Sequence, residues 1–220
     1  MTTPPNLPVA VWHRFVAKVE QLPEFSCPAL WAAPPRDDGY GQFWVPREAE
    51  LLLGEPERGT RPIDGQGELF PVPGTAGEDE VHLGKGRPWR AHRVAYAAWY
   101  GPIGPDDVVM HRCDRPLCTP ITRADVDRHL TLGTQQTNSQ DRESKGRTVG
   151  RRAYGLVVWG RGDRRGPYGR SLALHEAMTA ARQANADAAE MTRIVRQVDG
   201  AGDPHARQLI VPGGESQANS

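Results

Sequence analysis

One segment in the middle of the chain constrains the fold most, because it sets two histidines at matching ends of two short apolar runs. The run Val108–Met110 predicts a strand that ends at His111, and residues 129–133 predict a second strand that begins at His129. Residues 112–128, between the strands, hold prolines and aspartates and predict an irregular loop. Pairing of the strands would bring both imidazoles to the same end of a hairpin.

A helix is expected directly after the second strand, over residues 135–145. Thr134 is a suitable N-cap for this helix, and Gly146 is a suitable stop. Asn138 lies one turn into the helix, nine residues after His129. In a hairpin-plus-helix unit, the amide and the two imidazoles can converge on one point.

Such a set of side chains suits the hydrolysis of a phosphodiester bond. A neutral imidazole, with an ordinary pKa of about 6.5, can take a proton from water near neutral pH. A divalent cation can neutralise the charge that develops on the phosphate and on the leaving oxygen. Oxygen ligands such as Asn or Asp favour Mg²⁺ or Mn²⁺, whereas additional imidazoles favour Zn²⁺ or Ni²⁺.

The remaining patterns predict an α+β fold around this unit. Residues 8–22 predict an amphipathic helix, and Ala29–Ala33 and Gly41–Pro46 predict two strands that an Asp37-Asp38-Gly39 turn joins as a hairpin. Residues 89–100 predict a further helix. The expected units are an N-terminal helix and hairpin (1–53), a Gly/Pro-rich loop (54–88), a central core (89–147), a basic Gly/Arg linker (148–170), a helical appendage (171–210) and a disordered tail (211–220).

Two helices, over about residues 170–184 and 187–199, are expected in the appendage, where they could serve oligomerisation or bind a protein partner. Residues 85–170 carry 17 basic and 8 acidic side chains, whereas both flanks are acidic. A basic block of this kind is typical of a surface that faces DNA. No apolar run approaches the roughly 18 residues of a membrane span, and three cysteines are too few for a disulfide framework. We therefore expect a cytoplasmic protein without a membrane partner.

The chain resembles the HNH (His-Me finger) endonucleases of phages and actinobacteria over about residues 11–147. Six pieces carry the resemblance in order: WHRFVAKVE, DGYGQFWV, RAHRVAYAAWYGPI, VVMHRCDRPLC, HLTLGT and NSQDRESKGR. Each piece alone is weak, but their order is specific. The resemblance implies a two-stranded hairpin and a helix around one metal ion, and metal-dependent cleavage of DNA.

The resemblance also implies roles for single residues. His111 would be the general base that activates water, and His129 would mainly orient that base. Asn138 would bind a divalent metal ion, which is Mg²⁺ or Mn²⁺, or else Zn²⁺ or Ni²⁺, and Asp141 is a candidate additional ligand. The expected phosphate-binding residues are Arg142, Lys145 and Arg147 on the same helix face, together with Arg151 and Arg152 in the basic linker.

Three positions depart from the pattern of these nucleases. Met110 stands where many members have an Asp or His metal ligand, and Arg115-Pro116 stands where Asn-Pro is usual. The interval between Cys118 and His129 is longer than usual and is expected to bulge from the loop. Asp125 or Asp127 in that insert could supply the missing carboxylate.

Cys113 and Cys118 are either buried core thiols or two ligands of a structural zinc ion. The zinc alternative needs two further ligands from among Cys27, His92 and His129. His92 is expected on the polar side of its helix, where it could support the active site or cap the core.

The sequence thus predicts a metal-dependent DNA endonuclease. The alternative is a non-catalytic nucleic-acid-binding protein on a degenerate HNH scaffold, because Met110 cannot bind a hard cation. A protein–protein module that uses the acidic flanks is a third possibility.

Overall fold

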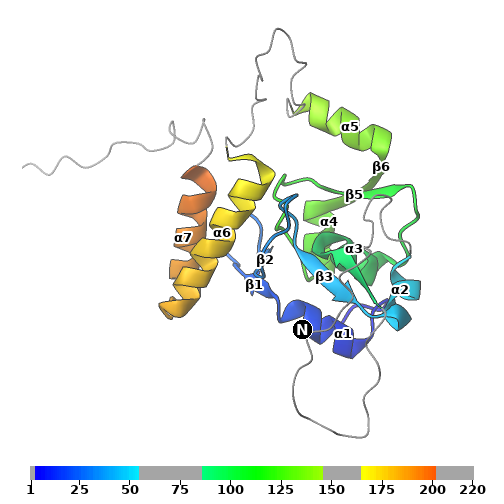
Figure 1. The fold of residues 1–220 in the computed structure, drawn as a ribbon, viewed down its shortest axis with the longest axis horizontal. Helices are drawn as coiled ribbons and strands as arrows, with labels where there is room; N and C mark the ends of the chain where they lie inside the picture. Colours follow the sequence, from blue (N-terminus) through cyan, green and yellow to red (C-terminus); the bar gives the residue numbers. More distant parts are fainter. Residues whose placement is uncertain (1–2, 55–85, 146–164, 202–220) are drawn as a thin grey trace, which may run out of the picture.

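The computed structural model describes residues 3–54, 86–145 and 165–201, which form a mixed α+β fold (Figure 1). The helices are α1 (Val9–Val16), α2 (Arg47–Leu53), α3 (Ala91–Tyr100), α4 (Arg123–His129), α5 (Gln135–Ser144), α6 (Gly166–Gln183) and α7 (Ala188–Ala201). The strands are β1 (Val19–Gln21), β2 (Ala29–Trp31), β3 (Gln42–Val45), β4 (Arg87–Arg90), β5 (Asp107–His111) and β6 (Leu130–Thr134). They form three antiparallel pairs, β1–β2, β3–β4 and β5–β6. The predicted α+β class is confirmed at this level.

The N-terminal part differs from the prediction in two ways. The helix predicted over 8–22 ends at Val16, and Val19 instead starts β1, where it pairs with Trp31 of β2. The predicted β2–β3 hairpin is wrong, because β2 pairs with β1 and β3 pairs with β4. The turn at Gly39 does form, with a φ of 83°, but the strands on its two sides have different partners. Pairing with distant strands has overridden the local pattern.

An aromatic cluster holds these elements together. The ring of Phe15 from α1 lies 5.6 Å from the ring of Trp31 in β2 and 5.2 Å from the ring of Phe43 in β3. Trp12 stacks on Phe15 at 5.3 Å. All four side chains are buried, so α1 and two separate strand pairs share one core.

The central unit follows the predicted order of strand, strand and helix. Strands β5 and β6 pair with His111 opposite Leu130, and α5 packs against both strands. Thr134 caps α5 as expected, in a reciprocal capping box with Thr137.

The segment between β5 and β6 is more regular than predicted. The insert expected to bulge from the loop folds into α4, with Val126 buried against the core. Thr122 caps this helix by accepting a hydrogen bond from the amide of Asp125. His129 is consequently the last residue of α4 and directly precedes β6.

Helices α6 and α7 lie side by side on one flank of the molecule (Figure 1). They contact the N-terminal part through polar groups. His175 of α6 shares a hydrogen bond of 3.0 Å with the carbonyl of Ala32. Arg182 pairs with Glu20, and Arg196 of α7 donates to the carbonyl of Glu24. Among the described helices, none has the length and apolar character needed to cross a bilayer.

The predicted loop 54–88 and linker 148–170 fall largely outside the described residues, and the tail 211–220 lies wholly outside them. Helix α6 begins at Gly166, within the segment predicted as linker.

Candidate functional site

His111 lies at the end of β5 with its imidazole buried. Its Nε2 is 2.9 Å from the carbonyl oxygen of Cys118. Because a carbonyl oxygen can only accept a hydrogen bond, Nε2 carries the proton, and Nδ1 of the neutral ring is then the basic nitrogen. Burial lowers the pKa of His111 below its ordinary value. The ring is therefore neutral near pH 7, with Nδ1 able to accept a proton.

Two aromatic side chains pack against His111. The ring centroid of His92, in the first turn of α3, is 4.5 Å from that of His111, and the ring of Tyr40 is 5.8 Å away. Tyr40 also contacts His92 at 4.9 Å, and Arg90 lies over the Tyr40 ring at 4.6 Å. The rings of Tyr40 and His92 thus pack against the His111 imidazole and against each other.

The prediction that His92 lies on a polar helix face is wrong, because only 3% of the residue is exposed. Burial lowers the pKa of His92 well below its ordinary value, and the nearby His111 and Arg90 lower it further. His92 is thus a neutral, buried neighbour of His111. Of the two roles expected for His92, support of the active site or capping of the core, its contact with His111 fits the first.

Asn138 lies on the half-buried face of α5, together with Asp141 and Lys145. Asp141 forms an ion pair of 2.9 Å with Lys145, which also contacts Asp114 at 2.9 Å. Lys145 therefore holds two carboxylates and ties α5 to the loop after β5, which the prediction of a phosphate-binding lysine did not foresee. Arg142 is exposed on the same helix.

Met110 fills the contact between the hairpin and α5. A Cβ placed on Gly133 would lie 2.5 Å from Cε of Met110 and 2.5 Å from Oγ1 of Thr137. The methionine therefore packs closely where the strand pair meets the start of α5. Asp125, one of the two candidates for the missing carboxylate, accepts a 2.6 Å hydrogen bond from Thr122 at the exposed start of α4.

A second group of side chains gathers beside His111. The ligand atoms of Cys27, Cys113, Cys118 and His129 all lie within 4.8 Å of one another, and we call these four residues the Cys₃His cluster. Cys27 comes from the segment between β1 and β2, the other cysteines follow β5, and His129 ends α4. Nδ1 of His129 is 3.8 Å from Sγ of Cys27.

The cluster favours a thiolate. Hydrogen bonds from the Cys118 and Cys27 thiols hold the pKa of Cys113 well below its usual range. Hydrogen bonds with Cys113 and Cys27 raise the pKa of Cys118, and the hydrogen bond with Cys113 raises the pKa of Cys27 to about 12. The three sulfurs thus lower the pKa of one thiol and raise the pKa of the other two. Thiolate is the form of cysteine that binds metal ions.

The residues of the cluster fit a structural zinc ion. Four N and S ligands around Zn²⁺, with Zn–S distances of about 2.3 Å, place ligand atoms about 3.8 Å apart, close to the separations found here. Mg²⁺ and Mn²⁺ prefer oxygen and would not select three sulfurs. Of the additional ligands expected for zinc, the structure brings in Cys27 and His129, whereas His92 contacts His111.

The position of His129 changes its expected role. Its ring faces the cysteines, and the contact that orients His111 comes from the Cys118 carbonyl. The backbone of His129 still contributes locally, because its carbonyl accepts a 2.8 Å hydrogen bond from the amide of Arg112. Arg147, Arg151 and Arg152 lie outside the described residues.

Two contacts were absent from the predicted site. Tyr40 belongs to the DGYG turn, whose polar residues pointed only to a connection between strands. Arg115 donates a hydrogen bond to Sγ of Cys27, and only its unusual place in the Cys-Asp-Arg-Pro stretch could have marked it.

Part of the chain is similar to Protein 7.7 of Escherichia phage T7. The two are 44% identical over 70 residues, which cover 29% of this chain and 49% of the phage protein. The match thus spans about half the length of this curated relative. No family profile matches the chain, and no solved structure matches it.

Proposed function

We propose that this protein is a metal-dependent HNH-type endonuclease that hydrolyses phosphodiester bonds of DNA. One observation carries the proposal: Nε2 of His111 donates to the Cys118 carbonyl, so Nδ1 is the base at the end of a hairpin that α5 follows. A histidine fixed in one tautomer and kept neutral by burial is what proton abstraction from water requires.

In the proposed reaction, Nδ1 of His111 takes a proton from the water that attacks phosphorus. Tyr40 and His92 keep the imidazole in place during this transfer, because both rings pack against it. The negative charge of the phosphate is attracted by the basic central region, in which Arg142 is exposed.

Asn138 would hold the catalytic divalent cation, with Asp141 as a second oxygen ligand once it leaves Lys145. A cation that keeps several of its own water molecules fits such a small set of protein ligands, as Mg²⁺ often does. When bound, the cation would supply neutralisation of the charge on the phosphate and the leaving oxygen.

The Cys₃His cluster has a different role in this proposal. It would hold a structural Zn²⁺ that closes the segment between β5 and β6. Cys118 serves both parts of the site, because its sulfur belongs to the cluster and its carbonyl orients His111. The structural ion would therefore keep the base in its working orientation without taking part in the chemistry.

The test is nicking of supercoiled plasmid with Mg²⁺, Mn²⁺, Ni²⁺ or Zn²⁺ added in turn. His111→Ala should lower the rate by about 10²–10⁴-fold, the usual contribution of a general base. His13→Ala, which removes an exposed histidine of α1, is the matched control and should nick at the wild-type rate. An inert wild type with every cation would refute the nuclease.

A non-catalytic DNA-binding protein is the second candidate. Met110, which cannot bind a hard cation, and the Asp141–Lys145 ion pair favour it, because both reduce the oxygen ligands available to a divalent cation. Retardation of DNA in a gel without cleavage by any of the four cations would establish this alternative.

A further inference from the structure

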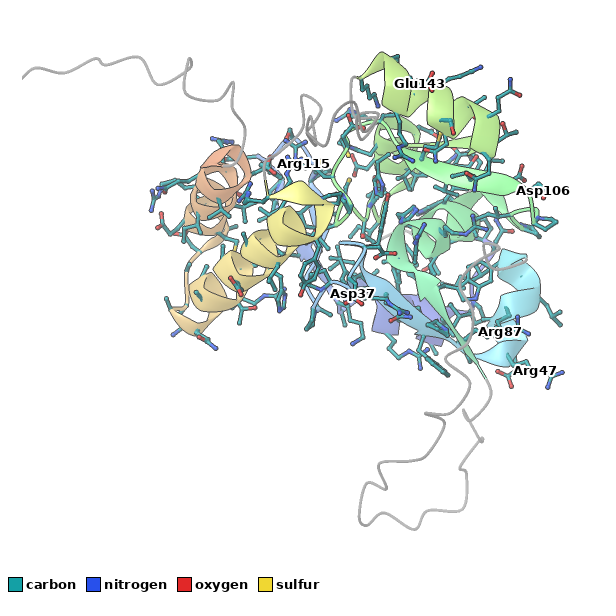
Figure 2. The ribbon with its side chains drawn as sticks, turned by 45° about the horizontal axis from the view of Figure 1, so that its top comes forward. Asp37, Arg47, Arg87, Asp106, Arg115 and Glu143 are labelled. Atoms are coloured by element: carbon teal, nitrogen blue, oxygen red, sulfur yellow. The ribbon has the colours of Figure 1, made fainter. Side chains whose placement is uncertain are left out.

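Arg115 links the Cys₃His cluster to the C-terminal helices. Its NH1 group lies 3.4 Å from Sγ of Cys27, and its Nε and NH2 groups donate to one oxygen of Asp199 at 2.9 and 2.8 Å. The guanidinium also lies over the ring of Phe25, at 5.1 Å. Figure 2 shows Arg115 beside the start of α6 and the end of α7.

Asp199 is held from both sides. Arg170 of α6 donates through Nε, at 2.8 Å, and through NH2 to the carboxylate oxygen that Arg115 does not use. Only 7% of Asp199 is exposed. Arg165 donates to the carbonyl of Val198 at 2.9 Å. The last turn of α7 is therefore fixed by arginines, one of which reaches the metal-binding cluster.

We propose that Arg115 is an outer-sphere ligand of the Cys₃His metal site and that Asp199 holds it there, so that the C-terminal helix pair takes part in metal binding. This inference rests on the structural-zinc part of the proposed function and is independent of nuclease activity. Arg115 is a positioning residue, since it would touch a sulfur ligand rather than the ion.

The charges support this assignment. Three thiolates and one Zn²⁺ leave one negative charge in a largely buried site. Arg115 supplies the compensating positive charge and a hydrogen bond to the Cys27 sulfur, and such outer-sphere donors stabilise coordinated ligands. Asp199 and Arg170 then balance each other. The whole group is neutral, as a buried set of charges needs to be.

The two hydrogen bonds to Asp199 also hold the Arg115 side chain in the position from which it reaches Cys27. A free Arg115 side chain would lose considerable rotamer entropy on holding a single sulfur. With two of its donors already bound to Asp199, the third is directed at Cys27 at little further cost. Metal binding and the docking of α7 are therefore coupled, and the coupling acts in both directions.

The test measures transfer of Zn²⁺ from the full-length, zinc-loaded protein to excess 4-(2-pyridylazo)resorcinol. Arg115→Gln should raise the release rate by about tenfold or more, the usual effect of losing an outer-sphere partner. Asp199→Asn, which keeps Arg115, should change it in the same direction by less. Arg182→Gln is the control, because it breaks the α6–Glu20 ion pair away from the cluster and should release zinc at the wild-type rate.

One bound zinc per chain, with release from Arg115→Gln and Asp199→Asn within about twofold of wild type, would overturn the inference and leave the metal site intact. A wild type that binds no zinc would overturn both the inference and the structural site. If Arg115→Gln does not fold, the comparison of Asp199→Asn with Arg182→Gln decides, because both remove a charge from the helix pair.

Discussion

His111 and Cys118 are joined by a 2.9 Å hydrogen bond between an imidazole nitrogen and a backbone carbonyl. The same cysteine contributes its sulfur to the Cys₃His cluster. Movement of that sulfur would therefore move the carbonyl that fixes the tautomer of the candidate base. Stability of the loop and orientation of the base depend on one residue.

Loss of a metal ion from the Cys₃His cluster should therefore affect both the stability of the fold and the orientation of His111. Cys27→Ser, which takes away one sulfur far from His111 in sequence, should lower the free energy of unfolding by about 3 kcal/mol or more. For a chain of this size that corresponds to a fall in Tm of roughly 6–12 °C. Thermal unfolding followed by circular dichroism measures it, with Ser26→Ala as the control. Equal Tm values for Cys27→Ser and wild type would argue against a metal at the cluster.

Acidification should destabilise the fold through His92. Its pKa in the folded protein lies well below the ordinary value, so the unfolded chain binds a proton that the folded chain excludes. This destabilisation is absent above about pH 6.5 and grows as the pH falls from there towards the lowered pKa of His92 in the folded protein. Its full size is about 1.4 kcal/mol for each unit by which the pKa is shifted.

Urea unfolding at pH 7.5 and pH 5.5 measures this effect. His92→Phe, which keeps an aromatic ring beside Tyr40 and His111, should lose less stability between the two pH values than wild type. His13→Ala, an exposed histidine, should behave like wild type. The same pH dependence in His92→Phe as in wild type would show that His92 is not the group concerned.

Lys145 should restrain Asp141 as a metal ligand. The ion pairs of Lys145 are about one-third exposed, so Lys145→Ala should cost less than about 1 kcal/mol of stability. If Asp141 can join Asn138 at the cation, the variant should reach half-maximal nicking at a lower Mn²⁺ concentration. Asn138→Ala should need more Mn²⁺. An unchanged Mn²⁺ requirement in Lys145→Ala would exclude Asp141 as a ligand.

Zinc removal should loosen α7 if metal binding and helix docking are coupled. Amide hydrogen exchange in Ala188–Ala201 should accelerate when zinc is chelated from wild type. In Arg115→Gln the helix should exchange faster before chelation and respond less to it. Exchange in α1 (Val9–Val16), which contributes no residue to the cluster, serves as the internal control.

The elements that carry the proposed chemistry could be predicted from local patterns. Thr134 marks the start of α5, and the apolar run before His111 marks β5. Their positions depend on neighbouring residues alone. The partner of β3 could not be predicted in the same way, since β4 lies more than forty residues later and its Arg-Pro-Trp-Arg sequence is not typical of a strand.

The site itself was predictable in part, for the same reason. His111 and Asn138 could be proposed because a hairpin followed by a helix defines their surroundings. Cys27 was recognised only as one of several additional zinc ligands, because nothing near it in the sequence indicates that β1 and β2 bring it to Cys113. Asp199 lies still further along the chain, and its partner Arg115 has no local signal.

Helix α4 lies between two residues of the cluster, Cys118 and His129, so both of its ends are anchored. A segment closed at both ends can be lengthened cheaply, at about 0.6 kcal/mol of closure entropy for each doubling. The interval can therefore accept extra residues without moving β5 or β6. Insertion of a short glycine–serine sequence directly before exposed Thr122, which leaves the N-cap of α4 in place, would use this tolerance to carry a tag or a fused domain close to the hairpin.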